Sequence, residues 1–240
     1  MPKRFVVAAS EFPDLPRYPA GVELAEALTV ASQQLHETLT PHSALRTAVR
    51  LAVHLMPGAE HAGVSVIERG STMRTLAWTD EVVRSAENRH TGREQHGLWN
   101  LLWNSPVARI TDSEADDGWD VLADLGLRSA LALRLRADRR RLTVLTAYAS
   151  KPGVFDEDAT RIGRLFTAHV SIALDSATVR EQLTEAMRTR DLIGQATGIL
   201  MERQGIDASA AFESLVRASQ RENVKLRDLA RRIVGAHNPP

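Results

Sequence analysis

The last quarter of the chain concentrates side chains that can bind anions and form hydrogen bonds. Arginine and lysine donate charge-assisted hydrogen bonds, while glutamine, serine and asparagine supply neutral donors and acceptors. Such a set suits the phosphate oxygens and hydroxyl groups of a polar partner. The candidate contact residues are Arg190, Gln195, Arg203, Ser219, Arg221, Asn223, Lys225 and Arg227.

The distribution of charge favours the same region. The chain of 240 residues has no net charge, with 30 Lys and Arg against 30 Asp and Glu. Residues 186–240 nevertheless contain nine Lys and Arg against six Asp and Glu, and the rest of the chain balances this surplus. A surplus of positive charge attracts phosphate groups. Four further arginines contribute to it, namely Arg188, Arg217, Arg231 and Arg232.

Residues for catalysis or metal binding do not occur in a recognisable spacing. The eight histidines are scattered, without the HxxxH or HExxH pairs of a helical metal site. The acidic stretch 112–120 lacks the fixed spacing and turn glycine of a calcium-binding loop. A P-loop, a GxGxxG sequence and a nucleophile elbow are also absent. We therefore expect no metal site, no catalytic residues and no enzymatic activity.

The chain contains no cysteine, which excludes disulfides, thiolate metal sites and cysteine nucleophiles. No stretch is apolar enough to cross a bilayer, and the short apolar run near the N-terminus is interrupted by prolines. We expect a soluble cytoplasmic protein with no membrane partner. Residues 1–20 contain Pro13, Pro16 and Pro19 and are expected to form a flexible arm.

The pattern of apolar residues predicts an α+β domain over residues 21–175. Helical spacing occurs in residues 22–39 and 41–56, and a short helix is predicted at 119–125. Alternating patterns predict strands at 62–67, 73–78, 107–110, 129–136 and 142–149. Residues 80–105 are ambiguous. The order of elements favours an antiparallel sheet flanked by helices.

A long helix is predicted to follow the sheet. Asp156 is a suitable helix cap, and neither proline nor a turn cluster interrupts the chain from there to Gly205. Its middle part, residues 176–189, is interpreted as a connector that resembles a coiled coil. The proposed seam is diluted by small and polar residues and consists of Ile172, Ser176, Val179, Leu183, Ala186, Arg190, Ile193, Thr197 and Leu200.

Residues 187–236 are predicted to form a separate module of three helices. The end of the long helix is the first, a second follows Asp207, and a third follows Asn223. Each helix is short and apolar on one side, so the three must share a core. Ala196 and Gly198 would let a neighbouring helix approach closely, and Phe212 and Leu226 would fill the core.

The tail closely resembles the ANTAR family. The resemblance rests on Arg-Asp-Leu-Ile-Gly-Gln-Ala-Thr-Gly-Ile-Leu-Met-Glu-Arg at 190–203, and on Ala211-Phe212, Leu215, Ser219, Asn223, Lys225-Leu226-Arg227 and Ala230. It implies an RNA-binding module of three helices that acts in transcription antitermination. Such modules usually work as dimers that hold a two-hairpin RNA and prevent a terminator from forming. A homodimer and paired stem-loops of a nascent transcript are therefore the expected partners.

The first part of the chain resembles a GAF domain. The resemblance rests on the acidic segment before Trp119, on Leu125-Gly126-Leu127-Arg128-Ser129, and on the strand, Pro-Gly-x-Phe turn and helix of residues 142–174. It implies a sensor or dimerisation unit rather than an activity. Without cysteine, a covalently attached bilin is excluded. We expect no known cofactor, although an unidentified small molecule could be the signal.

Two other functions remain as alternatives. A three-helix module behind a sensor also describes helix-turn-helix regulators, which read the major groove of DNA. The second tail helix carries only Arg217 among small residues, which makes it a poor reader, so no lasting contact with DNA is expected. The module could instead dock another protein, as an adaptor.

Overall fold

The computed structural model describes residues 21–69, 73–89, 97–116 and 119–237. The predicted flexible arm, residues 1–20, lies outside the described residues, as do His90 and His96. The chain divides into two compact units, residues 1–178 and 179–240. We describe each unit by itself.

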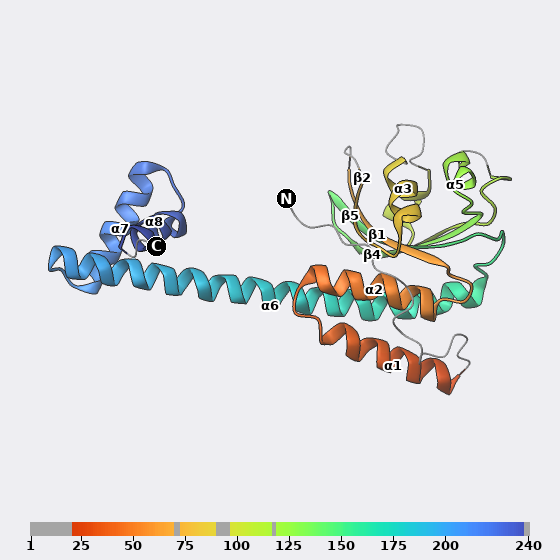
Figure 1. The fold of residues 1–240 in the computed structure, drawn as a ribbon, viewed down its shortest axis with the longest axis horizontal. Coiled ribbons are helices and arrows are strands. Elements are labelled where there is room, and N and C mark those ends of the chain that lie inside the picture. Colours follow the sequence, from red (N-terminus) through yellow and green to blue (C-terminus); the bar gives the residue numbers. More distant parts are fainter. Residues whose placement is uncertain (1–20, 70–72, 90–96, 117–118, 238–240) are drawn as a thin grey trace. The chain divides into compact units, whose positions relative to one another are not determined.

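The first unit is built on a five-stranded antiparallel sheet (Figure 1). Its strands are β1 (His61–Glu68), β2 (Met73–Trp78), β3 (Val107–Ile110), β4 (Ser129–Ala137) and β5 (Arg141–Ala149). They lie in the order β2-β1-β5-β4-β3, so β2 and β3 are the edges. The predicted hairpin of residues 129–149 is β4 and β5, which pair from Ser129 opposite Ala149 to Ala137 opposite Leu142.

Helices cover both faces of this sheet because its central strands are apolar on both sides (Figure 1). In β4, Leu131 and Leu133 belong to one buried cluster, whereas Ala130 and Ala132 belong to the other. Alternate residues of a strand point to opposite faces, so two cores result. The first core is closed by α1 (Val22–His36), α2 (Pro41–Leu55) and the beginning of α6 (Glu157–Gln204). The second is closed by α3 (Glu81–Arg89), α4 (Gly97–Asn104) and α5 (Asp120–Asp124).

Local sequence signals explain where the helices of the first core begin. Thr40 and Ser43 form a reciprocal capping box at the start of α2, and Pro41 occupies its first turn. At the start of α6, the Asp156 carboxylate accepts a hydrogen bond from the Ala159 amide at 2.8 Å. The ambiguous stretch 80–105 contains α3 and α4, which the mixed apolar pattern did not reveal.

The second unit consists of the last part of α6, then α7 (Ala208–Glu222) and α8 (Leu226–His237). Gly205, with φ at 62°, ends α6, and Asp207 caps α7 by accepting from the Ala210 amide at 2.9 Å. The predicted α+β class, with a long helix followed by a small helical module, is therefore confirmed. No described helix is long and apolar enough to cross a membrane.

Candidate nucleic-acid interface

The three helices of the second unit share a small apolar core. Ala196 from α6, Leu215 from α7, and Leu229 and Ala230 from α8 are buried in it. Its margin is formed by half-buried apolar residues, namely Leu192, Ile193, Leu200, Ala218, Val224, Leu226, Ile233 and Val234. Such a core is small, so the turns between the helices must also be held by specific hydrogen bonds.

The turn between α7 and α8 is fixed from inside by Ser219. This residue is 9% exposed, and its hydroxyl donates to the Val224 carbonyl at 2.6 Å. Asn223 ends α7 in the left-handed region, with φ at 51°, which asparagine adopts more readily than most residues. The hydroxyl of the predicted contact residue Ser219 therefore donates its hydrogen bond within the fold, whereas Asn223 is exposed.

The turn places two exposed cations on either side of Asn223. Arg221 lies in the last turn of α7, and Lys225 directly precedes α8. Within the part of the chain that the structure describes, neither side chain has an ion pair or a hydrogen bond. A free cation keeps its donors available for a partner, and the N-terminus of a helix favours phosphate.

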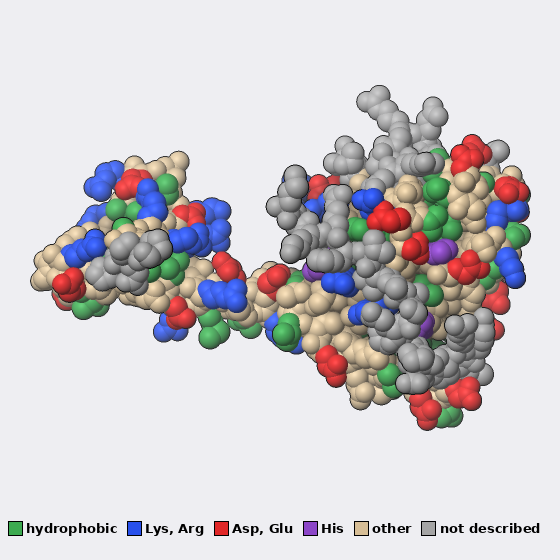
Figure 2. All heavy atoms as spheres, in the orientation of Figure 1, with side chains coloured by type: hydrophobic (Ala, Val, Ile, Leu, Met, Phe, Trp, Pro, Cys, Tyr) green, Lys and Arg blue, Asp and Glu red, His purple; other side chains and the backbone are tan. Residues whose placement is uncertain are grey.

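Four arginines on α7 and α8 lie beside acids. Arg217 lies 3.2 Å from Glu213, Arg231 lies 3.2 Å from Asp228, and Arg232 pairs with Glu222. The predicted contact residue Arg227 is half-buried, and its Nε lies 3.7 Å from the Asp228 carboxylate. Lys and Arg side chains are spread over the visible face of this unit (Figure 2). The lack of an acidic partner, not the number of cations, distinguishes the turn from the rest of α7 and α8.

The remaining predicted contact residues lie on α6. Arg190 and Gln195 are exposed, and Arg203 is exposed near the C-terminal end of the helix. Arg190 and Gln195 are five residues apart, which places them on different sides of an α-helix. The structure therefore brings Arg221, Asn223 and Lys225 together in one turn, but it does not gather all eight residues on one short segment.

Two residues expected in the core of the module are exposed instead. Phe212 is 44% exposed, because α7 turns Ala211, Leu215 and Ser219 inward at steps of four. The neighbouring Phe212 is thereby rotated to the edge of the buried face. Gly198 is exposed as well, and a Cβ added there would meet nothing within 4 Å. The close approach expected at Gly198 is thus not made within the described chain.

A buried carboxyl group in the first unit escaped the sequence prediction. Glu87 on α3 is 1% exposed and accepts hydrogen bonds from the hydroxyl groups of Ser65 and Tyr148, the latter at 3.3 Å. The helix lies so close to β1 that a Cβ added to Gly63 would be 2.5 Å from Glu87 Oε1. In the sequence, only the spacing of four residues between Val83 and Glu87 indicates that both lie on the same side of a helix. The structure shows that this side is buried.

Burial raises the pKa of Glu87 from 4.5 to about 7, although hydrogen bonds from Ser65, Thr75 and Tyr148 act in the opposite direction. A folded-state pKa above the unfolded value means that folding favours the protonated acid. Protonation of Glu87 therefore stabilises the folded unit fully below pH 4.5. This stabilisation falls as the pH rises toward 7 and is absent above that.

We predict that Glu87→Gln makes the first unit less sensitive to pH. Ionising the buried carboxyl between pH 5 and 8 should lower the free energy of unfolding of the unmodified unit by about 2 kcal/mol, a loss that a neutral amide avoids. All four tryptophans precede residue 120, so tryptophan fluorescence during urea unfolding reports this unit alone. An equal pH dependence in both proteins would contradict the ionisation of Glu87.

The histidines do not assemble a metal site in the described part of the chain, where no group of three or more potential ligands occurs. His61 instead pairs with Asp80, with 2.5 Å between Nδ1 and Oδ2. The hydrogen bond to Asp80 raises the pKa of His61 above its usual value. His169 is half-buried beside the buried residues of α6.

Comparison with known families gives two matches that follow each other along the chain. Residues 38–175 match the GAF domain family, and residues 181–234 match the ANTAR domain family. A search of curated proteins gives no match.

Comparison with solved structures agrees for the first match. A bacteriophytochrome from the photosynthetic bacterium R. palustris aligns with a TM-score of 0.61 at 13% identity, over 85% of this chain and 47% of that one. The phycoerythrobilin-bound GAF domain of a cyanobacterial phytochrome aligns with a TM-score of 0.52 at 12% identity, over 68% of this chain and 100% of that one. This chain thus spans about half of the bacteriophytochrome. At these identities the likeness shows the fold alone.

Proposed function

The chain belongs to the GAF domain family and carries an ANTAR domain behind it, and from this premise we propose that it regulates transcription antitermination by binding a two-hairpin RNA. The match of residues 181–234 to the ANTAR family carries the proposal. In this proposal the GAF domain acts as the sensor and dimerisation unit. The RNA is a nascent transcript, and binding prevents a terminator from forming.

The turn between α7 and α8 is the proposed centre of the RNA contact. Arg221 and Lys225 would pair with phosphates near a hairpin loop, and the exposed Asn223 between them would contact a base or a 2′-hydroxyl. Their open donors support this assignment, as does the position of Lys225 at the N-terminus of α8. Ser219 acts as a positioning residue, because its hydroxyl holds the turn.

The predicted residues of α6 extend the contact in this proposal. Arg190 and Arg203 would bind phosphates at the margins of the site, and Gln195 would supply a neutral donor and acceptor. Arg227 is half-buried beside Asp228, so we assign it a supporting role in which it orients the first turn of α8. Ala196 and Leu226 maintain the core that carries these residues.

In this proposal two chains hold the two hairpins, and α6 offers a surface for pairing. Ile172, Val179 and Leu183 are 57%, 54% and 59% exposed and follow the predicted seam. Burying such side chains against a second copy would release them from water. The seam cannot extend to Leu200 as the sequence suggested, because Ile193 and Leu200 pack in the three-helix core. We propose that it ends near Arg190.

Gel retardation of the full chain with two competitors tests the proposed function. A two-hairpin RNA should be retarded, whereas a DNA duplex of equal length and an unpaired RNA of equal composition should not compete. Preferential retardation of the DNA would favour the helix-turn-helix alternative. Retardation of neither nucleic acid at low salt would contradict RNA binding and favour an adaptor.

A further inference from the structure

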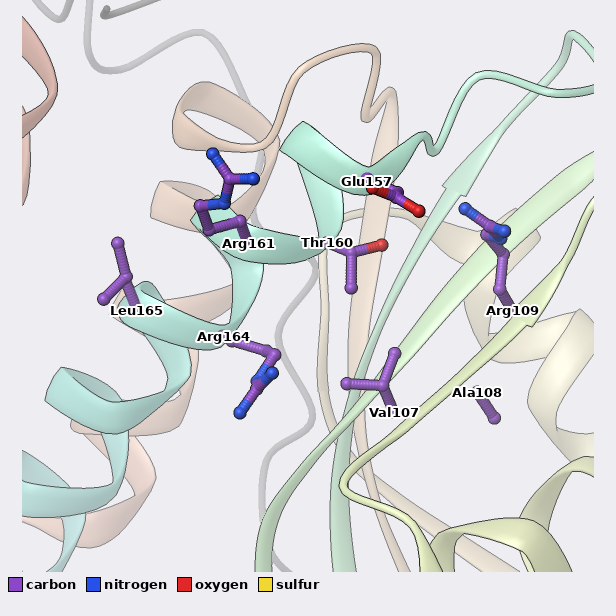
Figure 3. Close-up of a pocket in the computed structure, with 8 residues that line it drawn as sticks. All are labelled: Val107, Ala108, Arg109, Glu157, Thr160, Arg161, Arg164 and Leu165. Carbon is purple, nitrogen blue, oxygen red and sulfur yellow. The ribbon is translucent and has the colours of Figure 1, made fainter. Parts of the chain in front are cut away.

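An open groove runs along the first unit between the edge strand β3 and the beginning of α6, with a volume of about 610 Å³ (Figure 3). Three arginines line it, Arg109 from the strand and Arg161 and Arg164 from the helix. The remaining lining residues are Val107, Ala108, Glu157, Thr160 and Leu165. No residue of this groove belongs to the proposed RNA contact.

The groove exists because β3 is short and lies at the end of the sheet. The helices of the first core cover the central strands, and Val107 at the edge is only half-buried. On the helix, Leu165 is 45% exposed beside the same space. The floor therefore combines apolar side chains that the protein itself leaves partly uncovered.

The arginines that line the groove keep N–H groups that are available to a ligand. Arg109 Nη1 donates to the Phe155 carbonyl at 3.0 Å, which anchors this guanidinium and uses one of its five N–H groups. Figure 3 shows the anchored side chain reaching from the strand toward Glu157 and Thr160 on the helix. Arg161 lies 3.4 Å from Asp158, but both side chains are more than 70% exposed, so solvent weakens their attraction.

Arg164 has no such acidic neighbour. Among the described residues it forms neither an ion pair nor a side-chain hydrogen bond, and Figure 3 shows it between α6 and Val107. Three arginines line this groove, and the carboxylates of Glu157 and, beside Arg161, of Asp158 offset part of their charge. Like charges repel each other, so an anion that enters the groove relieves this repulsion.

We propose that this groove binds an organic anion of nucleotide size that carries at least two negative charges. Guanidinium groups bind phosphate and carboxylate oxygens through paired hydrogen bonds, and they stack on flat rings. Val107 and Leu165 offer the apolar contact that a ring needs and that inorganic anions lack. The volume lies within the range of sites that accept small molecules.

The edge of β3 argues against a peptide strand as the occupant. The Ser105 hydroxyl donates to the Val107 carbonyl at 2.8 Å and accepts from the Val107 amide at 3.3 Å. Those backbone groups are thereby occupied at the start of the edge, and a short strand leaves few others for an added strand. Recognition in the groove must rely on side chains, which suits a small ligand.

The position of the groove also suggests how the ligand would act. Arg109 belongs to the sheet, whereas Arg161 and Arg164 belong to α6, the helix that continues to Gln204. An anion bound by both would tie the start of this helix to the edge strand. The ligand would therefore stabilise the first unit, and its binding does not depend on RNA.

Calorimetric titration of the full chain with ADP, inorganic pyrophosphate and citrate tests the proposal. ADP should bind more tightly than pyrophosphate because only ADP can use the apolar floor, while citrate tests whether carboxylates replace phosphates. Arg164→Ala should weaken ADP binding about 10-fold or more, the usual effect of losing a charged hydrogen bond. Because Arg164 is exposed, this variant should fold normally, which its unfolding temperature without ligand will show.

Two control variants locate the binding. Arg74→Ala removes an exposed arginine from the opposite edge strand, and R221A/K225A removes the two exposed cations of the turn between α7 and α8. Both should bind ADP as the unmodified chain does. Absence of ADP binding at millimolar concentration would overturn the proposal, as would equal weakening by Arg74→Ala or loss of binding in R221A/K225A. The latter loss would place the anion in the ANTAR domain, without contradicting RNA binding.

Discussion

R221A/K225A should lower the affinity for a two-hairpin RNA by about 100-fold at roughly 0.1 M salt. Both side chains are exposed and, within the described residues, lack acidic partners, so their full charge is available to phosphates. Each phosphate contact that is lost also means that fewer counterions leave the RNA when the protein binds. The slope of the logarithm of the binding constant against that of the salt concentration should therefore become shallower by about 1.5.

R217A/R231A is the matched control, because it also removes two positive charges, one from α7 and one from α8. Arg217 and Arg231 are paired with Glu213 and Asp228, so they have less to offer a phosphate. This control should change the affinity by less than about 5-fold. Titrations over a range of salt concentrations, with fluorescence anisotropy of labelled RNA, measure both quantities. Equal losses in the two variants would show that net charge, not the turn, determines binding.

Much of the fold could be predicted because local signals and burial agree. The alternation in residues 129–136 and 142–149 predicted the central hairpin, since those strands send alternate residues into two cores. Asp156 and Gly205 predicted the ends of the long helix from local chemistry alone. The Asp156 carboxylate accepts a hydrogen bond from an amide of the first turn, and Gly205 adopts the left-handed conformation that ends a helix. The short α3 and α4 escaped detection because each has only about two turns of pattern.

The candidate sites depended on contacts that spacing does not reveal. Phe212 and Ala211 are neighbours in sequence, and only the rotation of α7 against its partners decides that Ala211 faces the core. Whether an arginine has an acidic partner likewise depends on its neighbours in space. Arg232 pairs with Glu222, whereas Arg221 has no ion pair among the described residues. Arg109 joins Arg164 in one groove because the sheet ends beside α6, although they are 55 positions apart in the sequence.

The second large effect is expected from charge in the proposed seam of α6. Leu183→Asp replaces a side chain that is 59% exposed in one chain and would be buried against a second copy. Two leucines are lost per dimer, and two like charges are brought together in an apolar contact. The dissociation constant of the dimer should rise about 1,000-fold or more, as measured by sedimentation at several protein concentrations.

Thr184→Asp is the control, since it places the same charge one residue further along α6, on the outer side of the proposed seam. It should leave the dimer intact. If two linked modules hold two hairpins, Leu183→Asp should also weaken binding of a two-hairpin RNA about 100-fold, yet leave binding of a single hairpin unchanged. A dimer that withstands Leu183→Asp would mean that the chains associate elsewhere. A chain that is monomeric before any substitution, with and without RNA, would mean that one module suffices for each RNA.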